Sequence, residues 1–502
     1  MLYLSKSKYC NLWQCPKLLW LNKIKPEEKT EDPALQARFD EGNVVGDLAM
    51  GLFGDFIEVT AFKKDGKLDL NEMMRLTKQY IDEGVENICE ASFSYNGLYC
   101  AVDILRKNGD GYAIYEVKSS TEEKYIYGVD IAYQKYVLEH CGVNVTGTYL
   151  VCIDSSYIRG DELEIDKLFK IIDMSSYVDI EIQNVPSLLR RAEEVMALKD
   201  DPDIDIGLQC EDPYDCAFWN YCTKHLPSPS VFNLYRLPFK KKIDYYYQGL
   251  ISHNDLLFSG KISNEMQIRQ MMFTTTNQEP YIDKEGIRDF LNTLSYPLYF
   301  LDFETMQQVI PQYKGTSPYD QIPFQYSLHY IEHEGGELKH KEFLAESGVD
   351  PRRALAERLC EDIPMDVCVT AYNKGFECGR IKELARAFPD LATHLLNIND
   401  NMADFLVPFR SGYYYNEAMA LGGKFSIKIV LPALFPDDPE LNYHNLEGVH
   451  NGTEAMTIFP RIKDLPPEEQ QKARHNLLKY CELDTYAMVK LWEELERVAE
   501  QA

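Results

Sequence analysis

Alternating apolar and polar residues mark two β-rich blocks, and helical periodicity lies between and after them. In the first block the alternation predicts strands at residues 87–95, 98–106 and 112–120. The turn-forming run Asn108-Gly109-Asp110-Gly111 predicts a hairpin between the last two strands. A helical stretch at 130–140 and another strand at 145–154 follow. The N-terminal part is therefore expected to combine a sheet with helices.

The second block has a different order of elements. It predicts three strands, a helix, a strand and two helices at 296–305, 324–333, 337–346, 352–363, 367–373, 377–388 and 474–498. A polar, mostly helical stretch separates the blocks. We therefore expect an α/β protein with an N-terminal domain at 1–228, a helical connector at 229–293 and a C-terminal domain at 294–502.

The charge balance restricts the function. Of the 502 residues, 52 are basic and 80 acidic, which leaves a net charge of −28. This argues against a protein that coats nucleic acid with a broad basic surface, but not against an enzyme that meets nucleic acid through carboxylate-bound metal ions. The chain has no apolar run of about 18 residues and no apolar signal-peptide core. We expect a cytoplasmic protein without a membrane span.

The first candidate site lies in the N-terminal hairpin. Asp103 lies in one strand, and Glu116 and Lys118 lie two residues apart in the next, so the latter two face the same way. Two carboxylates can hold a divalent metal ion, and a lysine can orient water. The alternative is a solvated strand face, which the apolar neighbours disfavour: Val102, Ile104, Ile114 and Val117.

This D…E-x-K pattern, followed by a helix with Tyr133-Gln134, resembles the PD-(D/E)XK nucleases of the RecB type. The resemblance implies that Asp103 and Glu116 bind Mg²⁺ or Mn²⁺, that Lys118 is catalytic and that Gln134 organises the site. Three features depart from the family pattern: Val102 replaces proline, Leu138 replaces a tyrosine although Tyr136 is close, and Gly46 and Asp47 stand where an upstream metal histidine is usual.

The cysteines form a second candidate site. The chain has 13 cysteines, and an odd number argues against a disulfide framework. Four thiolates can bind zinc or an iron–sulfur cluster, and the candidates are Cys15, Cys210, Cys216 and Cys222. The arrangement resembles the iron–sulfur subset of RecB-like nucleases, such as CRISPR-associated adaptation nucleases and AddB. This resemblance implies a 4Fe–4S cluster that links the two ends of the domain. Cys10 is an alternative ligand, and unrelated cysteines are the alternative to any site.

The third candidate site consists of four carboxylates in the C-terminal domain. Asp302 and Glu304 lie two apart in one strand, and Asp484 follows Tyr480 by four in the last helix, so each pair shares a face. Glu377 lies at a strand-to-helix junction. Four such carboxylates suit a two-metal site for phosphoryl transfer. The alternative is that these residues form no site, because each pair alone occurs by chance in many acidic chains.

The third pattern resembles the tyrosine-bearing branch of the DEDD exonucleases, which implies a ribonuclease-H-like fold. The four carboxylates would bind metal and Tyr480 would orient the attacking water. Glu377 departs from the aspartate of the family, and Asp404 is a nearby carboxylate that could compensate. Ser426 and Lys428 resemble the motif that supports the substrate. The whole chain resembles a bacterial family of unknown function that fuses the two modules.

These resemblances imply a metal-dependent nuclease acting on DNA or RNA. The C-terminal site would remove nucleotides 3′ to 5′, and the N-terminal site would cut single strands or trim ends. A nucleic-acid-binding scaffold with degenerate sites is the alternative, favoured by Glu377, by the missing histidine and by the net charge. A zinc-stapled interaction protein without catalysis is a third hypothesis.

Overall fold

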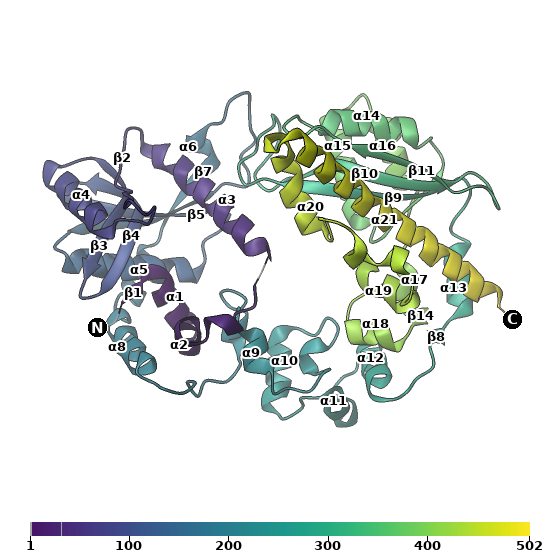
Figure 1. Cartoon of the computed structure of the whole chain (residues 1–502), viewed down its shortest axis with the longest axis horizontal. Helices are drawn as coiled ribbons and strands as arrows, with labels where there is room; N and C mark the ends of the chain where they lie inside the picture. The colour runs from purple at the N-terminus through teal and green to yellow at the C-terminus, as the bar shows by residue number, and fades with distance from the viewer. Residues whose placement is uncertain (1–2, 32, 502) are drawn as a thin grey trace. The chain divides into compact units, whose positions relative to one another are not determined.

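A computed structural model describes residues 3–31 and 33–501, and the chain folds as a mixed α/β protein (Figure 1). It contains two compact units. Unit 1 comprises Met1–His225 with Val309–Tyr319, and unit 2 comprises Leu226–Gln308 with Asp320–Ala502. The stretch expected as a connector, 229–293, lies inside unit 2.

Unit 1 is built on a seven-stranded sheet in the order β2-β3-β4-β5-β6-β7, with β1 paired to β4. Strands β3, β4 and β5 form an antiparallel meander. Asn96 and Gly97 make the turn between β3 and β4, and both have positive φ, 49° and 85°, as a tight two-residue hairpin requires. The strands are β1 (Leu4–Ser5), β2 (Ile57–Glu58), β3 (Asn87–Tyr95), β4 (Leu98–Asn108), β5 (Gly111–Lys118), β6 (Val145–Ile153) and β7 (Phe169–Asp173).

Helices cover both faces of this sheet. One apolar core packs α1, α4, α5, α7 and α8 against it, and a second core packs α3 and α6. Helix α5 connects β5 to β6, which lie parallel as such a crossover allows. The helices are α1 (Lys6–Gln14), α2 (Pro16–Ile24), α3 (Pro33–Ala49), α4 (Leu70–Glu83), α5 (Tyr125–His140), α6 (Ile165–Leu168), α7 (Ser175–Glu181), α8 (Val185–Met196) and α9 (Trp219–Thr223).

The segment Val309–Tyr319 was expected in the C-terminal domain but belongs to unit 1. Val309, Ile310 and Tyr319 pack into the apolar core that contains α3. The Tyr319 hydroxyl donates a hydrogen bond to the carbonyl of Ser119, the residue after Lys118. Burial of these apolar side chains accounts for the placement.

Unit 2 contains a five-stranded sheet in the order β11-β10-β9-β12-β13. Strand β10 is antiparallel to β9 and β11, whereas β12 is parallel to β9 and β13. A small separate sheet pairs β14 with β8. The strands are β8 (Tyr281–Ile282), β9 (Leu298–Gln307), β10 (Gln321–Ile331), β11 (Lys339–Leu344), β12 (Cys368–Ala371), β13 (Met402–Asp404) and β14 (Tyr414–Tyr415).

The two faces of the unit 2 sheet have different roles. Leu301 and Phe303 of β9 pack with α14, α15 and α16 in an apolar core, and the alternate residues face the other way, toward α21. The helices are α10 (Phe239–Tyr247), α11 (His253–Ser259), α12 (Glu265–Thr275), α13 (Lys284–Leu291), α14 (Arg352–Asp362), α15 (Gly375–Ala387), α16 (Ala392–Asp400), α17 (Val407–Arg410), α18 (Glu417–Gly422), α19 (Ile427–Leu434), α20 (Gly452–Ile458) and α21 (Pro467–Glu500).

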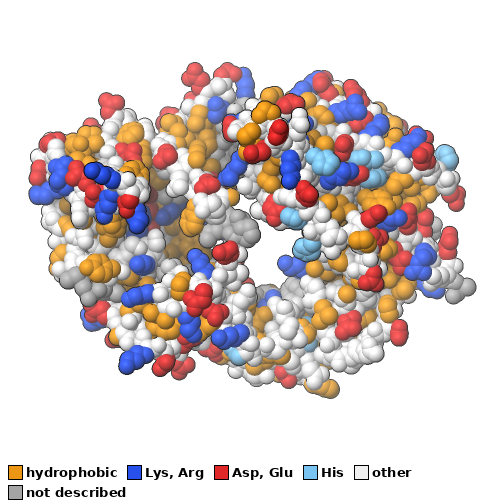
Figure 2. Space-filling view, viewed as in Figure 1, with side chains coloured by type: hydrophobic (Ala, Val, Ile, Leu, Met, Phe, Trp, Pro, Cys, Tyr) orange, Lys and Arg blue, Asp and Glu red, His pale blue; other side chains and the backbone are white. Residues whose placement is uncertain are grey.

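The surface charges and the polarity of the helices bear on two of the expectations from the sequence. On the face shown in Figure 2, acidic and basic side chains are interspersed. Within residues 3–31 and 33–501, no helix is both long and apolar enough to span a bilayer.

Candidate active site

Unit 2 brings the four predicted carboxylates together. Asp302 and Glu304 lie on β9, the central strand of the sheet. Asp484 lies on α21, where the neighbouring Cys481 sulfur is 3.9 Å from Asp302 Oδ2. Glu377 lies in the first turn of α15. The Glu304, Glu377 and Asp484 side chains are buried, so the cluster is held inside the unit.

Burial and neighbouring carboxylates raise pKa values within the cluster. Burial raises the pKa of Asp302 well above its ordinary value, and the other three carboxylates raise it further. Burial and then Asp484 raise the pKa of Glu304, and burial raises the pKa of Asp484. Lys428 lowers the pKa of all three groups. A single nearby ammonium group leaves most of this negative charge uncompensated, which favours a bound cation.

Two tyrosines and a lysine border the cluster. Lys428 Nζ donates to the Tyr480 hydroxyl at 2.9 Å and lies 4.7 Å from the centre of its ring. The Tyr443 hydroxyl donates to Asp484 Oδ1 at 2.6 Å. Burial and the adjacent Asp484 raise the pKa of Tyr480, so its phenol stays protonated and can donate a hydrogen bond. Tyr480 is thus placed to orient a water molecule or a phosphate oxygen.

Glu377 contributes a further buried carboxylate to the cluster. Its Oε2 is buried and has no hydrogen-bond partner among the described residues, and burial raises the pKa of Glu377 to about 8. Asp404, the candidate substitute, is already engaged: its Oδ1 accepts from the Asn373 and Leu406 amides and its Oδ2 from Arg410. Asp404 therefore braces the loop before α15, and Glu377 itself is the carboxylate available to a ligand.

A cleft of about 470 Å³ opens onto the cluster. Asp302 and Asp484 line it. Its other lining residues are mostly basic, aromatic or polar, together with two aliphatic side chains: Tyr235, Arg236, Tyr372, Asn373, Leu406, Arg410, Lys424, Phe425, Ser426 and Ile427. Basic side chains can hold phosphates and aromatic rings can stack on bases. The cleft thus combines two carboxylates with basic and aromatic side chains.

The residues of this cluster fit a divalent metal ion. Among the described residues, Asp302, Glu304 and Cys481 are the group whose ligand atoms all lie within 4.8 Å of one another. Carboxylate oxygens suit Mg²⁺ or Mn²⁺. A thiol is a softer ligand than these ions prefer, so Asp302 and Glu304 are the candidate ligands within this group. The orphaned Oε2 of Glu377 is a further oxygen awaiting a partner.

Unit 1 also assembles its predicted residues. Lys118 Nζ donates to Glu116 Oε1 at 2.5 Å, and Gln134 Nε2 donates to Glu116 Oε2 at 2.7 Å. Asp103 accepts a hydrogen bond from the Val117 amide at 2.7 Å. Burial raises the pKa of Asp103 and Glu116 raises it further. Asp47, which stands where a histidine was sought, is exposed on α3.

The structure adds site residues that the sequence analysis missed. In unit 1, Lys6 contacts both Asp103 and Glu116, and Asp130 contacts Lys118 and Gln134. Asp130 precedes Gln134 by four residues in α5, a helical spacing that could have indicated it. No sequence pattern indicated Lys6, because its partners lie 97 and 110 residues away along the chain.

In unit 2 the missed residues are Tyr443, Arg236, Tyr235 and Tyr372, which come from loops and short turns. These segments have no hydrophobic period that would connect them to β9 or α21. No pattern in the sequence therefore pointed to them.

The four predicted cysteines come from the first and last segments of the main stretch of unit 1, Met1–His225. Cys15 caps α2, and Cys222 lies in α9; both pack with Cys216 against one apolar cluster. Burial, with smaller contributions from the other three thiols, raises the pKa of Cys210 to about 12. Cys10 instead lies where Asp130 and Lys118 act on its pKa, which separates it from this group.

The spacing of the sulfur atoms bears on the cofactor. In the described chain, no three of these sulfurs lie within 4.8 Å of one another. A single tetrahedral zinc ion with Zn–S bonds of about 2.3 Å needs sulfurs about 3.8 Å apart. The described sulfurs therefore do not form a preassembled site for a single zinc ion.

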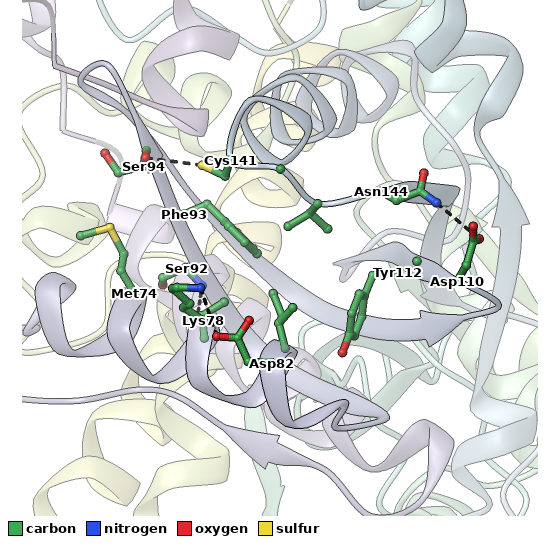
Figure 3. A pocket seen from close by; sticks show the side chains of 15 residues that line it. Met74, Lys78, Asp82, Ser92, Phe93, Ser94, Asp110, Tyr112, Cys141 and Asn144 are labelled. Carbon is green, nitrogen blue, oxygen red and sulfur yellow. Dashed lines mark hydrogen bonds and ion pairs between the residues drawn. The ribbon is translucent and has the colours of Figure 1, made fainter.

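Another cavity in unit 1, of about 530 Å³, lies between α4 and the loop after α5 (Figure 3). Its polar groups are paired locally: Lys78 with Asp82 at 3.0 Å, and Asn144 with Asp110 at 3.4 Å. None of the predicted site residues is among the described residues lining it. It is therefore separate from the acidic clusters.

The unit 2 cluster defines a candidate divalent-metal centre in an α/β domain. Residues 299–426, from the strand with Asp302 and Glu304 to Ser426, match the Domain of unknown function (DUF2779). No curated protein matches the chain. The family match thus covers three of the four carboxylates and comes without an assigned activity.

Proposed function

We propose that unit 2 is a metal-dependent exonuclease that hydrolyses phosphodiester bonds of single-stranded DNA or RNA from the 3′ end. The observation that carries the proposal is the convergence of Asp302, Glu304, Glu377 and Asp484 with Tyr480 beside a basic and aromatic cleft. The sheet order of unit 2 is consistent with the ribonuclease-H-like fold. The direction of cleavage follows from the resemblance to tyrosine-bearing DEDD exonucleases.

The four carboxylates would hold divalent cations, which activate water and stabilise the charge that develops on the phosphate. Tyr480 donates a hydrogen bond that orients the attacking water. Lys428 fixes the Tyr480 hydroxyl and offsets part of the acidic charge. Arg236 and Lys424 would bind phosphates of the strand, and Tyr235 and Phe425 offer faces for its terminal bases.

In unit 1, Cys15, Cys210, Cys216 and Cys222 would hold the iron–sulfur cluster, which supplies a structural link between the ends of the unit. The meander β3-β4-β5 followed by α5 and the parallel strand β6 is in keeping with a PD-(D/E)XK fold. The proposal places hydrolysis in unit 2 alone, because a lysine lies between the carboxylates of unit 1.

The test uses anaerobically purified full chain, Mn²⁺ and 5′-labelled single-stranded DNA and RNA. We expect a ladder of shortened products, slowed by more than about 1,000-fold in Asp302→Asn, which removes a metal ligand. Asp103→Asn and Glu468→Gln, an exposed carboxylate at the start of α21, should leave the ladder unchanged. A folded wild type that cleaves neither substrate contradicts the proposal, as does loss of cleavage in Asp103→Asn alone.

A further inference from the structure

The acidic cluster of unit 1 is saturated by protein donors. Lys6 Nζ lies 3.3 Å from Asp103 Oδ1 and 3.0 and 3.1 Å from the two oxygens of Glu116. The second Asp103 oxygen accepts from the Val117 amide. The Glu116 oxygens also accept from Lys118 and Gln134. Every carboxylate oxygen of the predicted metal pair is therefore already hydrogen-bonded.

Two lysines also offset much of the negative charge of this cluster. Lys6 and Lys118 face Asp103, Glu116 and Asp130, so two ammonium groups are arranged among three carboxylates. Burial would raise the pKa of Glu116, yet Lys118 and Lys6 hold it well below its ordinary value. A buried carboxylate kept ionised by two lysines has little demand for a further cation.

Lys6 is fixed in place by the fold. Leu4 and Ser5 pair with β4, and the Ser5 hydroxyl accepts from the Lys8 amide at the start of α1. The Tyr133 hydroxyl donates to the Leu4 carbonyl at 2.6 Å, and the Tyr133 and Tyr9 rings stack with centroids 4.7 Å apart. Displacing Lys6 would require its ammonium to leave a position set by a packed strand and helix.

We infer that the Lys6 ammonium occupies the cation position between Asp103 and Glu116, so that unit 1 holds its acidic cluster together without a divalent metal ion. The residues resemble a nuclease metal site, but their arrangement does not fit a metal ion while Lys6 is present. This inference concerns unit 1 and is independent of whether unit 2 cleaves nucleic acid.

The test counts Mn²⁺ bound per chain by electron paramagnetic resonance, in full-length protein with Asp302→Asn and Asp484→Asn to remove the unit 2 site. We expect this background to bind no Mn²⁺ in unit 1. Adding Lys6→Met should create one site per chain, and adding Glu116→Gln to that variant should abolish it. Lys8→Met, an exposed lysine on the same helix, is the matched control and should create none.

Thermal unfolding gives a second readout. Mn²⁺ should raise the Tm of Lys6→Met by several degrees and leave the background and Lys8→Met unchanged, since only a ligand of the folded state stabilises it. If Lys6→Met does not fold, Lys6→Gln, which keeps a hydrogen-bond donor, serves in both assays. A background with Lys6 intact that binds one Mn²⁺ lost in Glu116→Gln overturns the inference, and so does a folded Lys6 variant that binds none.

Discussion

Two buried glutamates show how the units differ. Glu116 on β5 and Glu304 on β9 both lie on strands within acidic clusters, and both are almost fully buried. The pKa of Glu116 is lowered because Lys118 and Lys6 outweigh its burial. The pKa of Glu304 is raised because burial and Asp484 outweigh Lys428. The same residue type thus has its pKa lowered where two lysines contact its carboxylate and raised where one lysine faces several carboxylates.

The comparison teaches that a pattern of metal-binding residues is not sufficient evidence for a metal site. Both clusters carry carboxylates with the spacing of a hydrolytic centre. What separates them is the number of donors around each oxygen: the Glu116 oxygens have hydrogen-bond donors on both sides, whereas Glu377 Oε2 has none. We therefore assign the cation to the cluster with unsatisfied oxygens.

The largest expected effect separates the units through the cysteines. Cys216→Ser should lose iron and the brown colour and lower the unfolding temperature of unit 1 by more than about 10 °C, because a structural cluster contributes directly to folding. Exonuclease activity should stay within about threefold of wild type, since domains largely fold as units. Iron analysis, calorimetry and the ladder assay measure these effects.

Cys141→Ser is the matched control, because Cys141 is an exposed thiol elsewhere in unit 1. It should keep the colour and the unfolding temperature. A colourless wild type that contains zinc would replace the iron–sulfur assignment with the zinc staple.

The next prediction tests whether removing a glutamate charge changes the stability of the two units in opposite directions. In EDTA, Glu116→Gln should destabilise unit 1 by about 3 kcal/mol, because it removes the main partner of two half-buried lysines. Glu304→Gln should stabilise unit 2 by about 1 kcal/mol, because it relieves repulsion among carboxylates. Urea unfolding measures both, and the tryptophans of unit 1, Trp13, Trp20 and Trp219, report that unit separately from Trp492.

Glu468→Gln should change neither transition by more than about 0.5 kcal/mol, as is usual for an exposed position. Destabilisation of unit 2 by Glu304→Gln in EDTA would show that its carboxylates are already satisfied, and the contrast between the units would be lost.

A smaller effect concerns pH. Burial raises the pKa of Glu377 from 4.5 to about 8 in the folded chain. Between these values the folded state retains a proton that the unfolded state has released, so stability falls as pH rises through this interval. Metal-free unit 2 should therefore lose about 5 °C in Tm between pH 5 and pH 8. Scanning calorimetry in EDTA should show this slope reduced in Glu377→Gln, and an equal slope in the variant would contradict it.

Local patterns in the sequence predicted much of the framework. The strands with long alternation were predicted within a few residues, for example β3 at Asn87–Tyr95, and the final helix was predicted correctly except that α21, Pro467–Glu500, begins seven residues earlier than expected. Asp302 and Glu304 could be placed on one face because the period of a strand is two. Short strands such as β1 and β13, of two and three residues, are too brief to show any period.

The decisive contacts of the sites were not predictable in the same way. Lys6 meets Glu116 only because β1 pairs with β4 and α1 packs on α5, a consequence of tertiary structure. The segment Val309–Tyr319 joins unit 1 for a similar reason, since its apolar residues fit a core built from distant parts of the chain. Sequence patterns identified the carboxylates, and three-dimensional packing determined what neutralises them.

The smallest expected effect is on substrate binding at the cleft of unit 2. Arg236 lines the cleft next to Tyr235, with its guanidinium 5.2 Å from the centre of that ring, where it would hold a phosphate of the strand. Arg236→Ala should raise KM for a single strand by about 5- to 10-fold at low salt, leave kcat nearly unchanged, and reduce the salt dependence of binding by about one phosphate contact. Lys240→Ala, an exposed basic residue on α10, should leave KM and the salt dependence unchanged. The charge of Arg236 is expected to act on the nucleic-acid strand and not on the metal. A fall in kcat without a change in KM would therefore contradict a role of Arg236 in substrate binding. It would indicate instead that Arg236 acts on the carboxylate cluster.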